Sequence, residues 1–120
     1  MLYHVGNIAS TSQRRRLLHV GDAATRDWLL AKLGGKVYTI TADVSHPIEM
    51  QDSGRAHESP SLLAEDSGLD AIARYLRANG ESEQDLIQYL TRKGYNCIKY
   101  TNKNEAPGSI CYVVWDWREE

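Results

Sequence analysis

The sequence predicts a single α+β domain in which helices pack against a small, mostly antiparallel sheet. The chain has 120 residues, a length that one domain commonly spans. Segments with the two-residue period of strands alternate along it with segments that have helical spacing. The last two strand-like segments are joined by a loop of about eight residues, which favours an antiparallel pairing between them. We therefore expect one domain over residues 1–120.

The first half of the chain is expected to form a strand, a helix and a second strand. Residues 2–6 read as a short strand that ends at Gly6, and residues 21–35 as a helix. Asp22 is the expected N-cap of that helix, and the two glycines at its end are a stop signal. Residues 36–44 alternate in polarity as a strand does, and Pro47 is expected to end it. One face of this strand would carry Tyr38, Ile40, Ala42 and Val44.

The second half is expected to form two helices and a closing pair of strands, after a polar loop over residues 51–60. The first helix has an apolar face at helical spacing and ends at Gly80. Its apolar face is formed by Leu69, Ile72, Ala73 and Leu76. Ser82 begins the second helix as an N-cap, and Gly94 closes it. The strands are expected at about 96–101 and 110–116.

Composition excludes several classes of protein. Of the residues 42% are hydrophobic and 25% charged, and the net charge is −2, which fits neither a disordered tail nor a strongly basic nucleic-acid binder. No apolar run approaches the length of a membrane span, and no signal peptide is visible, so we expect a cytosolic protein. Cys97 and Cys111 are then expected to be buried reduced thiols. A disulfide is geometrically possible if their strands are neighbours, but a cytosolic location disfavours it.

Few residues stand out as carriers of chemistry. The histidines and cysteines lack metal-ligand spacing, and neither a phosphate-binding glycine loop nor a serine-hydrolase elbow is present. His4 in the first strand is either a ligand contact or a histidine satisfied within the fold. Glu105, in the polar loop of the last hairpin, is either a site residue or a solvated acid. The residues alone leave both alternatives open.

Four segments together resemble one family. They are "LYHVG" at residues 2–6, "LHVGDAATRDWL" at 18–29, "VYTITADVSHPIEMQD" at 37–52 and "KGYNCIKYTNKNEAPGSICYVVWD" at 93–116. In this order they resemble the small ADP-ribosyltransferase domains of phage and prophage proteins, a group that some anti-CRISPR proteins also resemble. The resemblance implies an ADP-ribosyltransferase-like split antiparallel sheet core with flanking helices.

The same resemblance implies an activity. Enzymes of this family cleave the bond between nicotinamide and ribose in NAD, their co-substrate, and transfer the ADP-ribose to a nucleophile. The acceptor implied here is a host protein in the bacterial cytoplasm, with a CRISPR effector subunit as one candidate, and the protein would act as an inhibitor of bacterial defence or as a toxin. A nucleic-acid acceptor stays open. The alternatives are a non-enzymatic inhibitor that binds its partner with the same fold, and an NAD glycohydrolase that uses water as acceptor.

Glu105 receives the catalytic role by this resemblance. It would bind the ribose 2′-hydroxyl, stabilise the developing positive charge and take the proton of the acceptor. Asn102 and Ser109 would orient Glu105 or the ribose, although either can equally satisfy the backbone of the loop.

The first strand receives the remaining contacts. His4 would hydrogen-bond a ribose hydroxyl or the pyrophosphate, and the backbone at Val5 and Gly6 would pair with the carboxamide of nicotinamide, where a residue without a Cβ permits close approach. Tyr38 or another ring in the cleft would stack on nicotinamide, but Tyr38 also fits simple packing.

Overall fold

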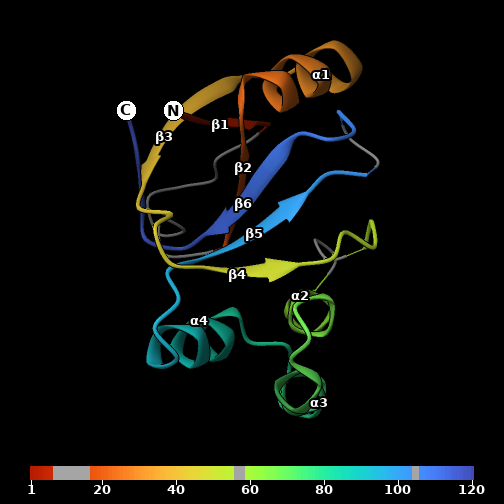
Figure 1. Ribbon diagram of the computed structural model, residues 1–120, viewed down its shortest axis with the longest axis vertical. Helices are drawn as coiled ribbons and strands as arrows, with labels where there is room; N and C mark the ends of the chain where they lie inside the picture. The colour runs from red at the N-terminus through yellow and green to blue at the C-terminus, as the bar shows by residue number, and fades with distance from the viewer. Residues whose placement is uncertain (7–16, 56–58, 104–105) are drawn as a thin grey trace.

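The computed structural model describes residues 1–6, 17–55, 59–103 and 106–120, and these form an α+β fold. Within those ranges there are four helices and one sheet of seven strands, with strand order β4-β5-β6-β2-β1-β3-β7. Figure 1 shows α1 at one end of the sheet and α2, α3 and α4 together at the other. The α+β class predicted from the sequence is confirmed, and the sheet is larger than the small sheet that we expected.

The sheet consists of two parts that are joined at one point. Strands β4 (Pro47–Met50), β5 (Cys97–Thr101), β6 (Ile110–Val114) and β2 (Leu18–Gly21) form one part. Strands β1 (Leu2–Val5), β3 (Val37–Ala42) and β7 (Trp117–Glu119) form the other. Between β1 and β2 the only paired residues are Tyr3 and Gly21. By contrast, β1 pairs with β3 and β2 pairs with β6 over all four residues of β1 and of β2, so the two parts diverge on either side of this contact.

All strand pairs in the described sheet are antiparallel except one. Strand β4 runs parallel to β5 at the edge of the sheet, with Pro47 opposite Cys97. The sequence analysis treated Pro47 only as the end of the preceding strand, and this was wrong because Pro47 begins a strand of its own. A proline lacks an amide hydrogen, but the first residue of an edge strand needs none on its outer side.

Helix α1 (Ala23–Leu33) begins and ends as the sequence predicts. The Asp22 side chain accepts a hydrogen bond from the backbone N–H of Thr25, and Gly34 closes the helix with φ +65°. Helices α3 (Asp70–Ala78) and α4 (Glu83–Arg92) also match their expected positions, and Ser82 caps α4 by accepting from the N–H of Asp85. Capping residues therefore identified α1 and α4, whereas apolar spacing and Gly80 identified α3, which has no side-chain cap.

Helix α2 (Pro60–Asp66) and strands β2 and β7 were not expected. Helix α2 begins at the last residue of the segment that was predicted as a polar loop, and Ser59 caps it ahead of Pro60 at its first turn. A serine cap followed by a proline is a recognised helix start, so this signal was present in the sequence. Strand β7 follows a bend after β6, where the prediction had one strand over 110–116.

Two groups of buried side chains hold the fold together. One lies between the α2–α4 helices and β4, β5 and β6, and its fully buried members include Leu76, Leu86 and Leu90. The other lies between the two parts of the sheet and contains Ile40 and Cys97. Its further members are Leu18, Val20, Val114 and Trp117.

The two cysteines are buried and unpaired with each other, as expected. Burial raises the pKa of the Cys97 thiol to about 11. In the described residues no helix is both long enough and apolar enough to cross a bilayer.

We predict that Leu86→Ala lowers the free energy of unfolding by about 2–5 kcal/mol, because it leaves a cavity in a fully buried position between α4 and the sheet. Leu33→Ala is the control, since Leu33 is 75% exposed and its loss should change stability by about 0.5 kcal/mol or less. Urea denaturation measures both. Equal effects of the two changes would contradict the assignment of Leu86 to the core.

Candidate functional site

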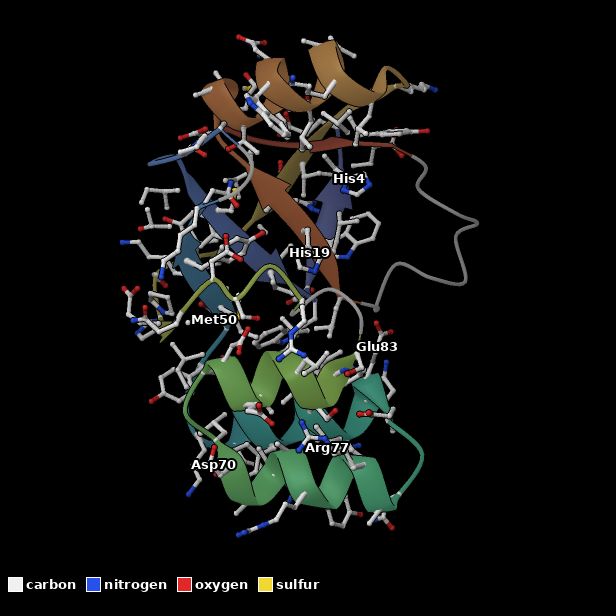
Figure 2. All side chains as sticks on the ribbon, turned by 90° about the vertical axis from the view of Figure 1, so that its right-hand side faces the viewer. His4, His19, Met50, Asp70, Arg77 and Glu83 are labelled. Atoms are coloured by element: carbon white, nitrogen blue, oxygen red, sulfur yellow. The ribbon has the colours of Figure 1, made fainter. Side chains whose placement is uncertain are left out.

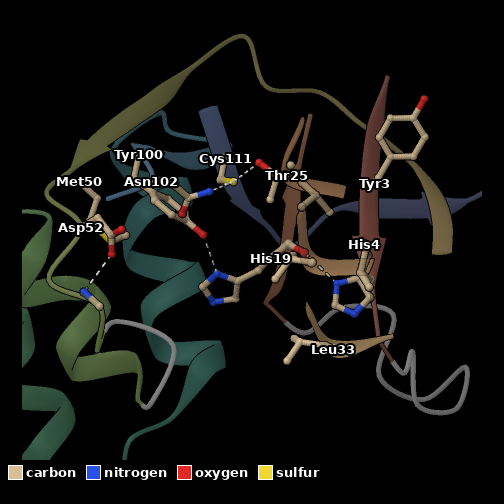
Figure 3. Close-up of a pocket in the computed structure, with 15 residues that line it drawn as sticks. Tyr3, His4, His19, Thr25, Leu33, Met50, Asp52, Tyr100, Asn102 and Cys111 are labelled. Atoms are coloured by element: carbon tan, nitrogen blue, oxygen red, sulfur yellow. Dashed lines mark hydrogen bonds between the residues drawn. The ribbon is translucent and has the colours of Figure 1, made fainter. Parts of the chain in front are cut away.

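A pocket of about 370 Å³ opens where β1 and β2 diverge. Its volume lies in the range of small-molecule sites. Figure 2 shows His4 and His19 on this side of the molecule, between α1 and the α2–α4 layer, and Figure 3 shows the lining at close range. The lining comes from both parts of the sheet, from α1 and from the segment after β4. It comprises Tyr3, His4, Val5, His19, Val20, Gly21, Thr25, Leu29, Leu33, Met50, Asp52, Gly54, Tyr100, Asn102 and Cys111.

His4 has a defined tautomer because its hydrogen-bond partner is a carbonyl. Its Nδ1 lies 2.8 Å from the backbone oxygen of His19, and a carbonyl oxygen can only accept. Nδ1 therefore carries the proton, and in the neutral ring Nε2 is an acceptor. This contact also connects β1 to β2 beyond their single paired position. The first strand thus contributes a fixed acceptor to the pocket.

His19 and Tyr100 form a second polar pair in the lining. The Nδ1 atom of His19 lies 3.3 Å from the hydroxyl of Tyr100, and the two rings meet edge to face with centroids 6.2 Å apart. Because β6 lies between β2 and β5 in the sheet, this pair reaches across the middle strand. It defines the part of the pocket wall between His4 and the last hairpin, as Figure 3 shows.

Asn102 marks the start of the β5–β6 loop and is only 5% exposed. Its backbone N–H donates to the carbonyl of Ser109, and its carbonyl accepts from the N–H of Gly108, which closes the base of the loop. Both hydrogens of its side-chain amide are also used. Nδ2 lies 3.1 Å from Oγ of Ser109 and 2.8 Å from Sγ of Cys111. The side chain is therefore held in one orientation.

Thr25 links this group to α1. Its hydroxyl lies 2.7 Å from Oγ of Ser109 and 3.4 Å from Sγ of Cys111, and it is also within 3.1 Å of the Asp22 carboxylate. Burial works to raise the pKa of Asp22, but hydrogen bonds from Thr25 and from the N–H of Ile110 outweigh it, so this pKa is lowered. Asp22 therefore stays ionised and anchors the hydroxyl network at the start of α1.

Cys111 forms part of the pocket floor, but its thiol is not activated. Burial raises its pKa, and this outweighs the opposing hydrogen bonds from Thr25 and Asn102. A thiol held in its protonated form is a poor nucleophile. We infer that Cys111 serves the site by packing and hydrogen bonding.

Gly21 is required where α1 meets the sheet. A Cβ at this position would lie 2.7 Å from Cβ of Thr25 and 3.0 Å from Sγ of Cys111, which is closer than real Cβ contacts permit. The same residue forms the single pair with Tyr3 that joins the two parts of the sheet. The glycine thus allows the helix, the sheet and the pocket floor to meet at one point.

Asp52 is the lining residue that sequence reasoning missed most clearly. One carboxylate oxygen accepts from the N–H of Gly54 and the other from the N–H of Lys103, each at 2.9 Å. These bonds connect the segment after β4 to the residue that follows Asn102. The Asp-Ser-Gly order at 52–54 was assigned to a polar loop, and only the parallel pairing of β4 with β5 brings it beside the last hairpin.

The structure brings together some of the residues predicted from the sequence. His4, Val5 and Asn102 line the pocket, and Ser109 lies behind Asn102. Gly6 follows the lining residues with φ +126°, and its N–H donates to the carbonyl of Lys36. If the Gly6 N–H supplied the expected backbone contact with a carboxamide, this bond would have to open.

One of the predicted residues, Tyr38, lies outside the pocket lining, and Glu105 is not among the described residues. Tyr38 is opposite His4 in the β1–β3 pair with ring centroids 6.4 Å apart, and it is not a lining residue. The Nζ of Lys36 lies 5.0 Å from the centre of its ring. Glu105, the expected catalytic acid, lies outside the described residues. Besides Asp52, sequence reasoning gave no role to the lining residues His19, Thr25 and Tyr100.

The described residues contain no cluster of three or more histidine, cysteine, aspartate or glutamate side chains that could hold a metal ion. Comparison with known proteins finds no matching family, no matching curated protein and no matching solved structure. The pocket and the sequence patterns are therefore the features of this protein that bear on its function.

We predict that Thr25→Val lowers the free energy of unfolding by about 1–3 kcal/mol, because valine keeps the shape but leaves the buried Ser109 hydroxyl without its partner in α1. Thr91→Val, at an exposed position of α4, is the matched control and should change stability by about 0.5 kcal/mol or less. Urea denaturation of both variants measures the difference. Equal stabilities would show that the hydroxyl network does not hold α1 to the sheet.

Proposed function

We propose that this protein is an NAD-dependent mono-ADP-ribosyltransferase that modifies a protein. One observation carries the proposal: His4 and Asn102, from opposite ends of the chain, line one pocket at the point where the sheet divides. The sequence resemblance independently assigns both residues to the binding of NAD. The divided sheet also supports the proposal, since a split sheet is what the resemblance implies.

The proposed reaction breaks the bond between C1′ of the ribose and the ring nitrogen of nicotinamide. The bonding electrons leave with nicotinamide, which departs as a neutral molecule because its ring is cationic in NAD. The ribose then resembles an oxocarbenium ion, as in the cleavage of glycosides. A nucleophile of the acceptor forms the new bond to C1′ and gives up its proton. The enzyme must hold the ribose, stabilise its positive charge and direct the acceptor.

The pocket offers groups suited to the first of these tasks. Nε2 of His4 is an acceptor in the neutral ring, so it can receive a hydrogen bond from a ribose hydroxyl. Tyr3 and Tyr100 provide aromatic surface in the lining, and the apolar side chains of Leu29 and Met50 exclude water. We propose that this pocket takes the nicotinamide and ribose half of NAD.

Glu105 carries the proposed catalytic role on the sequence pattern alone. It lies in the chain between Asn102 and Ser109, and both of these residues are held by the hydrogen bonds at the base of the β5–β6 loop. A carboxylate in this position of the sequence would stabilise the ribosyl cation and accept the proton of the acceptor. The acceptor we propose is a protein of a bacterial host.

The test is to incubate the protein with NAD and host lysate, to measure nicotinamide release, and to find adducts by intact-mass spectrometry. We expect an adduct of one ADP-ribose unit. Glu105→Gln should lower kcat/KM by about 100-fold or more, and His4→Ala by about 10- to 100-fold. His46→Ala is the control, because His46 is exposed, hydrogen-bonds Ser45 and does not line the pocket.

The other outcomes separate the alternatives. Nicotinamide release without an adduct would identify an NAD glycohydrolase. A partner that copurifies equally with the wild type and Glu105→Gln, with no loss of NAD, would identify a binding protein and overturn the proposal.

A further inference from the structure

We propose that Asp52 makes the pocket selective for a cationic N-ribosyl pyridinium over the same nucleoside in its reduced, neutral form. The inference rests on the proposed function, because it takes the nicotinamide and ribose half of NAD as the ligand. Asp52 is then a specificity-determining residue, and the property of the ligand that it recognises is the positive charge of the ring.

Asp52 determines the charge of the described pocket lining. The described lining residues include two histidines and one aspartate, Asp52, and among them there is no glutamate, lysine or arginine. An aspartate is negatively charged at neutral pH. The guanidinium of Arg26 lies 4.4 Å from the centre of the Tyr3 ring. Arg26 is not a lining residue, however, and it forms an ion pair with Asp27. The described lining therefore offers a negative charge and no arginine or lysine to balance it.

The position of the Asp52 carboxylate is fixed by the backbone. Its two oxygens accept from the N–H groups of Gly54 and Lys103, and these are neutral dipoles. Such bonds orient a carboxylate and stabilise it without cancelling its net charge. Each oxygen has a further lone pair, so the group can still attract a cation in the pocket. Figure 3 shows Asp52 beside Met50, at the end of the pocket away from Tyr3 and Leu33.

Two further groups in the lining are acceptors. The Nδ1 proton of His4 is committed to the carbonyl of His19, which leaves Nε2 as an acceptor. Both amide hydrogens of Asn102 are committed to Ser109 and Cys111, so its side-chain oxygen can act only as an acceptor. Asn102 lines the pocket and is only 5% exposed.

A ligand suited to this lining has hydrogen-bond donors and a positive charge. A ribosyl pyridinium has both, since its hydroxyls and carboxamide donate and its ring is cationic. The pyrophosphate of NAD has neither property, and the described lining supplies no arginine or lysine for it. We therefore take nicotinamide riboside, which lacks phosphates, as the minimal ligand. Its reduced form keeps the ribose and the carboxamide, and gains a hydride that removes the charge of the ring.

The experiment is isothermal titration of nicotinamide riboside and of reduced nicotinamide riboside into three proteins: wild type, Asp52→Asn and Asp43→Asn. We expect the wild type to bind the oxidised nucleoside at least about tenfold more tightly, because a carboxylate a few ångströms from a cation near a protein surface contributes at least that factor. In Asp52→Asn the preference should fall to about threefold or less, through weaker binding of the oxidised form.

Asp43→Asn is a matched control. Asp43 also accepts a hydrogen bond from the backbone N–H two residues later, that of Ser45, but it does not line the pocket. It should keep the preference of the wild type. Asp52→Glu retains the charge and should retain most of the preference, which separates the effect of charge from a loss of loop geometry.

Three results would overturn the inference. They are equal binding of the two nucleosides by the wild type, an unchanged preference in a folded Asp52→Asn, and binding of neither nucleoside. The first and third need no variant, so they hold even if Asp52→Asn fails to fold. Cleavage of NAD with equal binding of the two nucleosides would leave the proposed function standing and remove the inference. Charge-selective binding without cleavage of NAD would do the reverse.

Discussion

The pairing of Tyr3 with Gly21 is the constraint on which the rest of this structure depends. It is the single paired position between β1 and β2, so the sheet is continuous there and divided on either side. A side chain at residue 21 would strike Thr25 and Cys111, so the contact also requires a glycine. The pocket exists because the strands separate beyond this point, and it has a floor because α1 can approach the sheet so closely.

The polar groups of the site are stabilised because their hydrogen bonds form one connected network. The hydroxyl of Thr25 hydrogen-bonds Ser109 of the β5–β6 hairpin and also lies within hydrogen-bond distance of the Asp22 carboxylate. This carboxylate also caps α1. A buried hydroxyl or amide without a partner is costly, and in the described residues every buried side-chain nitrogen and oxygen has one. The same network that satisfies these groups also holds the carbonyl oxygen of Asn102 in one place. Structural stability and the presentation of acceptors therefore have a common origin.

The two ends of the molecule have different tasks. Helices α2, α3 and α4 cover one buried group of side chains and contribute no residue to the pocket lining. Helix α1, the start of the chain and the last hairpin build the site, and the segment after β4 closes it through Asp52. Because β4 also packs against the helical layer through Met50, the helices support the wall of the pocket that carries Asp52.

The sequence by itself determined several of the local elements of this protein, among them α1, α4 and β3. Asp22 and Ser82 as caps, Gly34 as a stop and the alternation in β3 all act over a few residues, so they could be read directly. Apart from the antiparallel pairing of the last two strands, tertiary structure alone decided which strands are neighbours. The parallel pairing of β4 with β5 placed Asp52 beside Lys103, and the order of the sheet placed His19 opposite Tyr100. No local pattern contains such contacts, because they depend on the burial of apolar faces by segments that lie far apart in the chain.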